Sequence, residues 1–319
     1  MNLLNHPHLG KIFFSLFMVP HFLMLVKFRV FPKLIQLSIF YSYGLNQLFG
    51  HSSIPIERLA NVRVISNRVH YKARNYQFSL IIPTFERAAC LNRSFYRILA
   101  NRPKHTEIIV VDDGSKSKEK NNLLMKISRE KHTFVLQHAI SCGAFHSKLD
   151  GFYFAVGDYI MSLDDDDTFD EKYYIELASK IDYKYDFYVP LNNWLNKWIK
   201  LPAKTWRLFM TNYHNHVTYA FRKELMENIS YPFIDTTIIR DDAPLMIPIY
   251  LNSDYSRVKY YNNTNQYRLD KFCKCEHQTR LIRKRKNVKK GMDFLMQYIK
   301  MKGLENFTLV IKNAYKYAK

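Results

Sequence analysis

Four consecutive aspartates, Asp164 to Asp167, are the densest group of chemically capable side chains in this chain. They follow residues 159–163, whose β-branched and aromatic composition predicts a buried strand that delivers the acids at its tip. Adjacent carboxylates repel one another, and a cation relieves that repulsion. Hard oxygen donors suit Mg²⁺ or Mn²⁺, ions that commonly hold nucleotide phosphates. The segment predicts either a metal–diphosphate site or an acidic cap on the next helix, because Asp also favours helix N-termini.

The elements that must position these acids alternate between strand and helix. Strands are predicted at residues 77–83, 107–112, 133–137 and 159–163, and helices at residues 87–100, 121–131 and 144–156. This alternation predicts an α/β fold with a mostly parallel sheet and right-handed crossovers. Ligands of such sheets bind beyond the carboxyl ends of the strands. Asp112 and Asp113 end one strand and the aspartate cluster ends another, so both are expected at one crevice.

Composition bounds the remaining possibilities. The chain has 319 residues, 47% of them hydrophobic, which is ample for a large core. Lys and Arg total 48 against 28 Asp and Glu, and the formal charge of +20 suits anionic lipid, nucleic acid or phosphorylated substrates. The four cysteines (Cys90, Cys142, Cys273 and Cys275) do not follow a zinc-binding pattern in sequence, and we interpret them as free thiols.

The two ends of the chain differ from its middle. Residues 12–26 and 34–49 are apolar with basic flanks, and the first run is short for a membrane span. They favour an interfacial helix pair on an anionic membrane, or helices that simply cover the core. Basic residues at 280–290 precede an amphipathic helical pattern at 294–301. We therefore expect an N-terminal helical extension at residues 1–75, a catalytic domain at 76–272 and a basic helical region at 273–319.

Three stretches in order and spacing carry a family resemblance. They are Ile82-Pro83-Thr84-Phe85-Glu86-Arg87, then Val111-Asp112-Asp113-Gly114-Ser115, then Gly157-Asp158-Tyr159-Ile160 leading to Asp164-x-Asp166-Asp167. Together they resemble family-2 glycosyltransferases over about residues 77–246. The resemblance implies a GT-A fold, in which an α/β domain binds a nucleotide-sugar.

The resemblance also implies a donor pocket. Pro83, Thr84 and Glu86 match the residues that line the nucleotide site on the first strand–helix loop. Asp113 matches the acid that recognises the base, commonly uracil, through a ring N–H. Asp112 is the alternative, since strand alternation separates neighbouring side chains. A turn that needs Asp and Gly for geometry alone is the competing interpretation.

The same resemblance implies the catalytic groups. Asp164 and Asp166 match the metal-binding acid pair for Mn²⁺ or Mg²⁺, with Asp164 on the ion or the donor ribose. Asp242 matches the base that deprotonates the acceptor, and Asp241 is the alternative; a helix N-cap before residues 243–251 is the competing role. Lys148 stands where relatives carry Arg, and it can meet a phosphate as a point charge only.

These expectations define one hypothesis. The protein is expected to be an inverting, metal-dependent glycosyltransferase with a UDP-sugar donor and a glycan or lipid-linked acceptor in surface polysaccharide synthesis. Aromatic and amide side chains at residues 186–215 suit a carbohydrate acceptor. A cytoplasmic location, peripheral at the inner face of the membrane, follows from the basic and apolar ends, and no nucleic-acid partner is expected because no nucleic-acid-binding signature accompanies them.

Two rival functions are weaker. A sugar-phosphate nucleotidyltransferase would need a Gly-rich basic loop after the first strand, and residues 82–87 lack it. A non-catalytic membrane or nucleic-acid-binding protein on a decayed transferase fold is disfavoured by the intact acids Asp113, Asp164, Asp166 and Asp242.

Overall fold

The computed structural model describes residues 61–65, 75–169, 172–191, 219–227, 229, 242–253, 255–262, 267–269 and 285–303. The apolar stretches at residues 12–26 and 34–49, and Asp241, lie outside these ranges. Most of the aromatic and amide segment expected to bind the acceptor also lies outside them. The predictions made for those residues therefore remain predictions.

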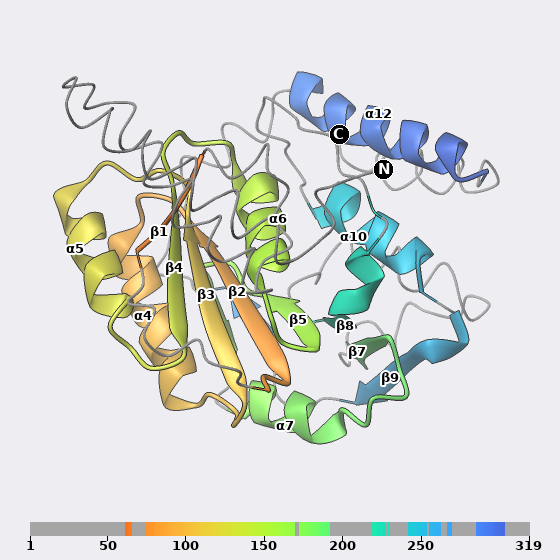
Figure 1. Cartoon of the computed structure of the whole chain (residues 1–319), viewed down its shortest axis with the longest axis horizontal. Helices are drawn as coiled ribbons and strands as arrows, with labels where there is room; N and C mark the ends of the chain where they lie inside the picture. Colours follow the sequence, from red (N-terminus) through yellow and green to blue (C-terminus); the bar gives the residue numbers. More distant parts are fainter. Residues whose placement is uncertain are drawn as a thin grey trace, which may run out of the picture. The chain divides into compact units, whose positions relative to one another are not determined.

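An eight-stranded sheet forms the centre of the described chain (Figure 1), in the order β1-β4-β3-β2-β5-β8-β7-β9. The strands in that order are β1 (Val62–Val64), β4 (Thr133–His138), β3 (Thr106–Asp112), β2 (Phe78–Thr84), β5 (Tyr159–Ser162), β8 (Ala220–Arg222), β7 (Phe187–Leu191) and β9 (Val258–Asn262). A separate antiparallel pair joins β6 (Asp167–Phe169) to β10 (Tyr267–Leu269).

The four strands β4, β3, β2 and β5 run parallel to one another. Every residue of β2 and β3 is buried, which explains their nearly continuous apolar sequence, because helices cover both faces of a parallel sheet. Strands β1 and β8 are antiparallel to their neighbours in this block. The predicted mixed α/β fold with a mostly parallel sheet is confirmed.

Helices α4 (Ala88–Ala100), α5 (Lys118–Ile127) and α7 (Tyr173–Lys180) share one core with alternate residues of the strands. That core contains Leu80 and Val110 of the sheet together with Phe95 of α4 and Leu177 of α7. Helix α6 (Ala144–Phe154) contacts the opposite face, where its Gly151 lies against Ile81 and Val111. The sheet is therefore covered on both sides.

The predicted element boundaries agree closely with the structure, apart from one helix. The helix expected at residues 121–131 instead begins at Lys118 and ends at Ile127. Its start is set by Ser117, whose hydroxyl oxygen accepts the N–H of Lys120 at 3.2 Å. The cap lies four residues before the predicted start of the helix at residue 121.

Helix α10 (Asp242–Leu251) contacts α12 (Arg285–Met301). The apolar stripe expected on α12 is buried at Phe294, Leu295, Tyr298 and Ile299. Those side chains are thus used within the fold rather than presented to lipid. Among the described residues, no helix combines the length and apolar character needed to cross a bilayer.

Two cysteines fall within the described chain, and they differ. Cys142 is a free thiol, as expected. Cys90 is disulfide-bonded, which corrects the expectation of a free thiol at that position. The spacing of cysteines in sequence could not identify this bond, because its formation depends on which residues the fold brings together.

Candidate active site

The carboxyl ends of β2, β3 and β5 meet at one edge of the sheet (Figure 1). Thr84, the last residue of β2, lies opposite Asp112, the last residue of β3. On the other side, Ile81 of β2 lies opposite Ser162 at the end of β5. The expected convergence of two acidic strand ends is confirmed by this register.

The acids after β5 form a turn rather than an extended tip. Leu163 still donates its N–H to the carbonyl of Ile81 at 2.8 Å, and Asp167 then donates to the carbonyl of Asp164 at 3.0 Å. The side chain of Asp165 is fully buried, whereas those of Asp164 and Asp166 are 32% and 20% exposed. The turn thus divides the cluster into two buried acids, Asp165 and Asp167, and two that face outward.

Asp165 anchors this turn in a buried polar network. Its carboxylate accepts hydrogen bonds from the hydroxyl of Thr84 and from the guanidinium of Arg87. Lys120 of α5, also buried, donates from its ammonium to the same Thr84 hydroxyl. Burial raises the pKa of Asp165, against the opposing effects of Arg87 and Lys120, and burial lowers the pKa of Lys120, against those of Asp165 and Asp112. The network ties β2, α5 and the acidic turn together.

The two outward acids each face a cation. Lys148 of α6 places its Nζ 3.1 Å from Asp164 Oδ1, and Arg87 places Nη1 2.6 Å from Asp166 Oδ2. Lys148 is only 2% exposed, so its charge is directed at the turn rather than at solvent. A pair of partly exposed carboxylates that collects positive charge from two separate elements is a suitable oxygen donor set for Mg²⁺ or Mn²⁺. The residues present therefore fit the predicted divalent ion.

The loop after β3 is held by Asp112. Its carboxylate accepts the N–H of Ser115 at 2.9 Å, the Ser115 hydroxyl at 2.5 Å and the Gln137 amide at 3.2 Å. Gly114 adopts φ +81°, a left-handed conformation that favours glycine. The turn interpretation of this segment therefore describes Asp112 well.

Asp113 holds the next loop along the same edge. Its Oδ1 accepts from His138 Nδ1 at 2.9 Å and from the Cys142 N–H at 2.8 Å. Its Oδ2 accepts from the Ser141 hydroxyl at 2.6 Å and from the Gly143 N–H at 2.8 Å. A carboxylate offers about four acceptor positions. Recognition of a base N–H by Asp113 therefore requires one of these donors to move away.

His138 lies between two carboxylates. Its Nδ1 faces Asp113 and its Nε2 lies 3.0 Å from Asp150 Oδ2. Burial by itself would lower the pKa of His138, but the hydrogen bonds with Asp113 and Asp150 outweigh it and raise that pKa well above the ordinary value. Burial would raise the pKa of Asp113, and the bond with His138 and the other donors lower it instead.

Glu86 joins the two loops of this edge. Its carboxylate accepts the N–H groups of Lys116 at 2.6 Å and Ser117 at 3.3 Å, and its own N–H donates to the Ser115 hydroxyl. The bond from Lys116 holds the pKa of Glu86 below its ordinary value. Glu86 has φ +57°, so its backbone is in the left-handed region. Pro83 and Thr84 precede it in β2, and the contact of all three with a nucleotide stays a prediction.

For the predicted base Asp242, the structure describes only the backbone. Asp242 is the first residue of α10, with Pro244 in the first turn, as the helix-start interpretation expected. Asp241 lies outside the described residues, and the side chain of Asp242 is not described. The assignment of either acid as the base therefore remains a prediction.

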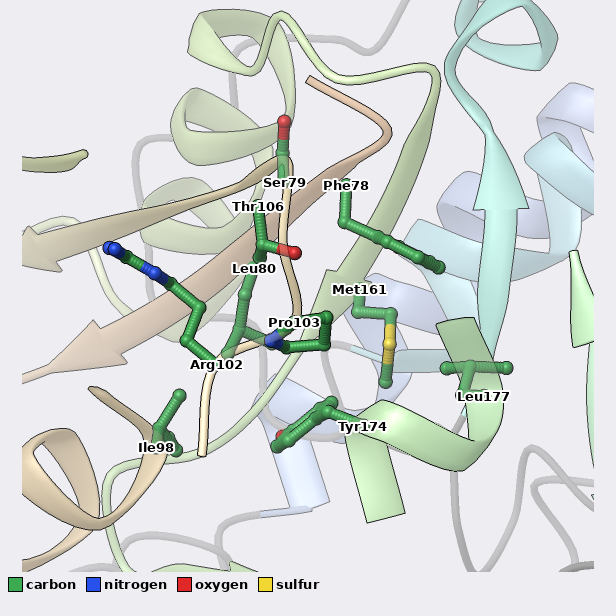
Figure 2. Close-up of a pocket in the computed structure, with 10 residues that line it drawn as sticks. All are labelled: Phe78, Ser79, Leu80, Ile98, Arg102, Pro103, Thr106, Met161, Tyr174 and Leu177. Atoms are coloured by element: carbon green, nitrogen blue, oxygen red, sulfur yellow. The ribbon is translucent and has the colours of Figure 1, made fainter. Parts of the chain in front are cut away.

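A small cavity lies far from this edge (Figure 2). It is lined by the beginning of β2, by Thr106 at the beginning of β3, and by Ile98, Tyr174 and Leu177 from the covering helices. Its volume of about 10 Å³ is that of roughly one water molecule. Because these are the amino ends of the strands, the cavity is a packing gap in the core and not a ligand site.

Four residues whose side chains contact the acids, Thr84 or one another at this edge were not predicted from the sequence as site residues: Arg87, Lys120, His138 and Asp150. Arg87 is the last residue of the first motif, so its position was available as a signal. Lys120 is one of many lysines in a basic chain, and nothing in its local sequence distinguishes a buried lysine from a solvated one. His138 and Asp150 acquire their roles only because β4 and α6 meet beside β3.

Comparison with known proteins gives a family. The model of glycosyl transferase family 2 matches residues 79–237, about half of the chain. The glycosyltransferase MG060 of Mycoplasma genitalium is 25% identical over 202 residues, which cover 61% of this chain and 58% of that protein. This chain therefore matches less than two thirds of that relative's length.

Solved structures give more distant likenesses. S. aureus TarS, residues 1–349, has a TM-score of 0.48 and 20% identity, with 60% of each chain covered. The same fragment in complex with UDP-GlcNAc has a TM-score of 0.46 and 20% identity, with 60% of this chain and 57% of that chain covered. The mannosyltransferase PcManGT from Pyrobaculum calidifontis, in complex with GDP-Man and Mn²⁺, has a TM-score of 0.47 and 14% identity over 70% of this chain and 65% of that chain. Likeness at this level does not identify the substrate of this chain.

Proposed function

Because this chain belongs to glycosyltransferase family 2, we propose that it moves a sugar from a UDP-linked donor to a glycan or lipid-linked acceptor with inversion at the sugar carbon. The mixed sheet is the GT-A arrangement expected for this family. One observation carries the proposal: the acidic turn after β5 presents Asp164 and Asp166 at the carboxyl edge, each against a cation from another element. Departure of a nucleoside diphosphate requires a site of this kind, in which positive charge is held beside acids.

On the donor side, the reaction requires stabilisation of negative charge. As the glycosidic bond to the donor breaks, negative charge develops on the departing diphosphate. Asp164 and Asp166 would hold Mn²⁺ or Mg²⁺, which when bound supplies electrostatic stabilisation of that charge. Lys148 and Arg87 already lie at these two acids, so they are placed to meet phosphate oxygens once the acids have another partner. Asp113 or Asp112 would recognise the base after exchange of one loop donor.

The acceptor side needs a base. Asp242, at the start of α10, is our candidate, with Asp241 as the alternative. A carboxylate that removes the acceptor proton from the side opposite the departing diphosphate gives in-line attack, and in-line attack inverts the sugar carbon. Substitution Asp242→Asn is expected to reduce transfer about 10²–10⁴-fold while leaving UDP binding intact. Loss of folding in this variant, seen by circular dichroism, would instead favour a helix-capping role.

The metal and donor assignment is tested by titrating UDP, GDP and CMP by calorimetry, with and without Mn²⁺, and by measuring hydrolysis of the corresponding sugar donors. We expect UDP binding that requires the ion and is lost in Asp166→Ala. The matched control is Asp158→Ala, which removes an exposed acid just before the opposite end of β5. If Asp166→Ala binds UDP and turns over the donor as the wild type does, the metal assignment is wrong.

We further propose that the protein acts in surface polysaccharide synthesis and sits at the cytoplasmic face of the membrane through its N-terminal extension. The support is the basic composition and the apolar runs with basic flanks at residues 12–26 and 34–49. Flotation with anionic and neutral liposomes tests this for the full chain and for a chain lacking residues 1–60. Equal flotation of both forms would refute the role of the extension.

A further inference from the structure

We propose that Cys142, His138 and Asp113 form a binding site for Zn²⁺, separate from the hard-ion site at Asp164 and Asp166. Within the described chain, Cys142 Sγ, a His138 ring nitrogen and an Asp113 carboxylate oxygen lie within 4.8 Å of one another. A thiolate, an imidazole and a carboxylate are a donor set that suits zinc.

The ligand atoms are close to the spacing that zinc requires. His138 Nδ1 lies 3.2 Å from Cys142 Sγ and 2.9 Å from Asp113 Oδ1. Tetrahedral zinc with ordinary bond lengths needs about 3.6 Å between sulfur and nitrogen and about 3.4 Å between nitrogen and oxygen. In these two pairs the ligand atoms must therefore separate by about 0.5 Å, whereas Cys142 Sγ and the Asp113 oxygen, which lie within 4.8 Å of each other, must come to about 3.6 Å.

Each ligand is also oriented by a second group. Asp150 Oδ2 lies 3.0 Å from His138 Nε2, so a proton held on Nε2 leaves the Nδ1 lone pair directed at Cys142 Sγ and Asp113 Oδ1. The amide of Asn61 donates to Cys142 Sγ at 3.2 Å, a contact that stabilises a thiolate. The Oδ2 of Asp113 is held by Ser141 and Gly143, which leaves its Oδ1 turned towards His138. Carboxylate–histidine pairs of this kind are a regular feature of zinc sites.

Access and proton balance are both satisfied. Cys142 is partly exposed whereas Asp113 and His138 are buried, so the ion can enter from the Cys142 side and keep an open fourth position there. Binding displaces the proton that Nδ1 shares with Asp113 and the thiol proton of Cys142, and both protons pass to solvent. Asp113 Oδ1 retains its bond from the Cys142 N–H and gives its second lone pair to the metal.

The test is a titration with Co²⁺, which replaces Zn²⁺ and reports thiolate ligation by a sulfur-to-metal charge-transfer band. Full-length wild type in excess Mg²⁺ is expected to show this band, to lose it on addition of Zn²⁺ and to bind one more equivalent of Zn²⁺ than Cys142→Ser does. The serine variant keeps nearly the same volume and should keep the circular dichroism spectrum of the wild type. A band of equal strength in Cys142→Ser, or no band in the wild type, would overturn the proposal.

A second variant keeps all three ligands. Asp150→Asn should weaken Zn²⁺ binding about 10–100-fold, because it removes the charge that orients His138. Unchanged affinity in Asp150→Asn would overturn the assignment of His138 as a ligand. Zinc held at this edge is also expected to weaken UDP binding through Asp113; that consequence rests on the proposed function, whereas the cobalt titration does not depend on it.

Discussion

Substitution of Glu107 by Gln tests how the sheet below the active site is held. Glu107, the second residue of β3, is fully buried. Its Oε1 accepts the Ser79 hydroxyl at 2.5 Å and the Val156 N–H at 2.8 Å, and the same hydroxyl accepts the Gly157 N–H at 2.8 Å. Glu107 thereby joins β2 and β3 to the connection that leads into β5. Its Oε2 has no hydrogen-bond partner among the described residues.

Burial raises the pKa of Glu107 from 4.5 to about 7, although the bonds from Ser79 and Val156 act in the opposite direction. A shift of one pKa unit corresponds to about 1.4 kcal/mol, so this group changes the free energy of unfolding by about 3 kcal/mol. The folded chain binds the proton more tightly than the unfolded chain between the two pKa values. The contribution is therefore fully present below about pH 4.5 and is lost as the pH rises to about 7.

Gln cannot ionise, so the pH-dependent loss should vanish in Glu107→Gln. The measurement is urea unfolding of both proteins at intervals from pH 4.5 to pH 8. Relative to the wild type, the variant should gain about 3 kcal/mol of unfolding free energy across this range, whatever constant offset the new amide introduces. Glu119→Gln, at an exposed position of α5, controls for the loss of one charge. A difference between wild type and Glu107→Gln that does not vary with pH would refute the reasoning.

Two further predictions concern the same framework. Gly157→Ala should lower the melting temperature more than Gly151→Ala. At position 157 the new Cβ would lie 2.5 Å from the Phe78 carbonyl carbon and 2.7 Å from the Ser79 nitrogen, which are backbone atoms. At position 151 it would lie 2.3 Å from a side-chain methyl of Ile81, and Ala is favoured over Gly within a helix such as α6; thermal unfolding in the reverse order would contradict this. Lys120→Met should cost about 3–5 kcal/mol by leaving Asp165 with less positive charge, and the double variant with Asp165→Asn should recover part of that loss. Strictly additive effects in the denaturant double-mutant cycle would show that the two groups do not interact.

The central strands and helices were predictable from local pattern. Residues 77–83 and 107–112 form nearly continuous apolar runs, and strands β2 and β3 match them within one residue. Such runs are typical of parallel strands buried on both faces, so pattern and fold agree. The short strands β1, β7, β8 and β9 were not predicted, because segments of three to five residues carry too little periodicity.

The candidate site was predictable as a place more than as a set of contacts. That Asp112, Asp113 and the cluster after β5 meet at one edge follows from the rule that parallel strands end together. That rule does not say which acids of the cluster 164–167 are buried and which face outward. Asp165 is the internal anchor because a turn points it at Thr84 and Arg87, and no sequence spacing specifies which of four adjacent acids will face inward.

The sequence by itself determined the family, the alternation of strands and helices, and the edge at which the acids gather, because each depends on short-range order along the chain. Only the tertiary structure decided that Arg87 and Lys148 face the outward acids, that Lys120 is buried beneath them, and that Cys142 meets His138 and Asp113. These contacts join residues from separate elements. Their energies depend on burial and on distances of a few ångströms, which sequence spacing does not encode.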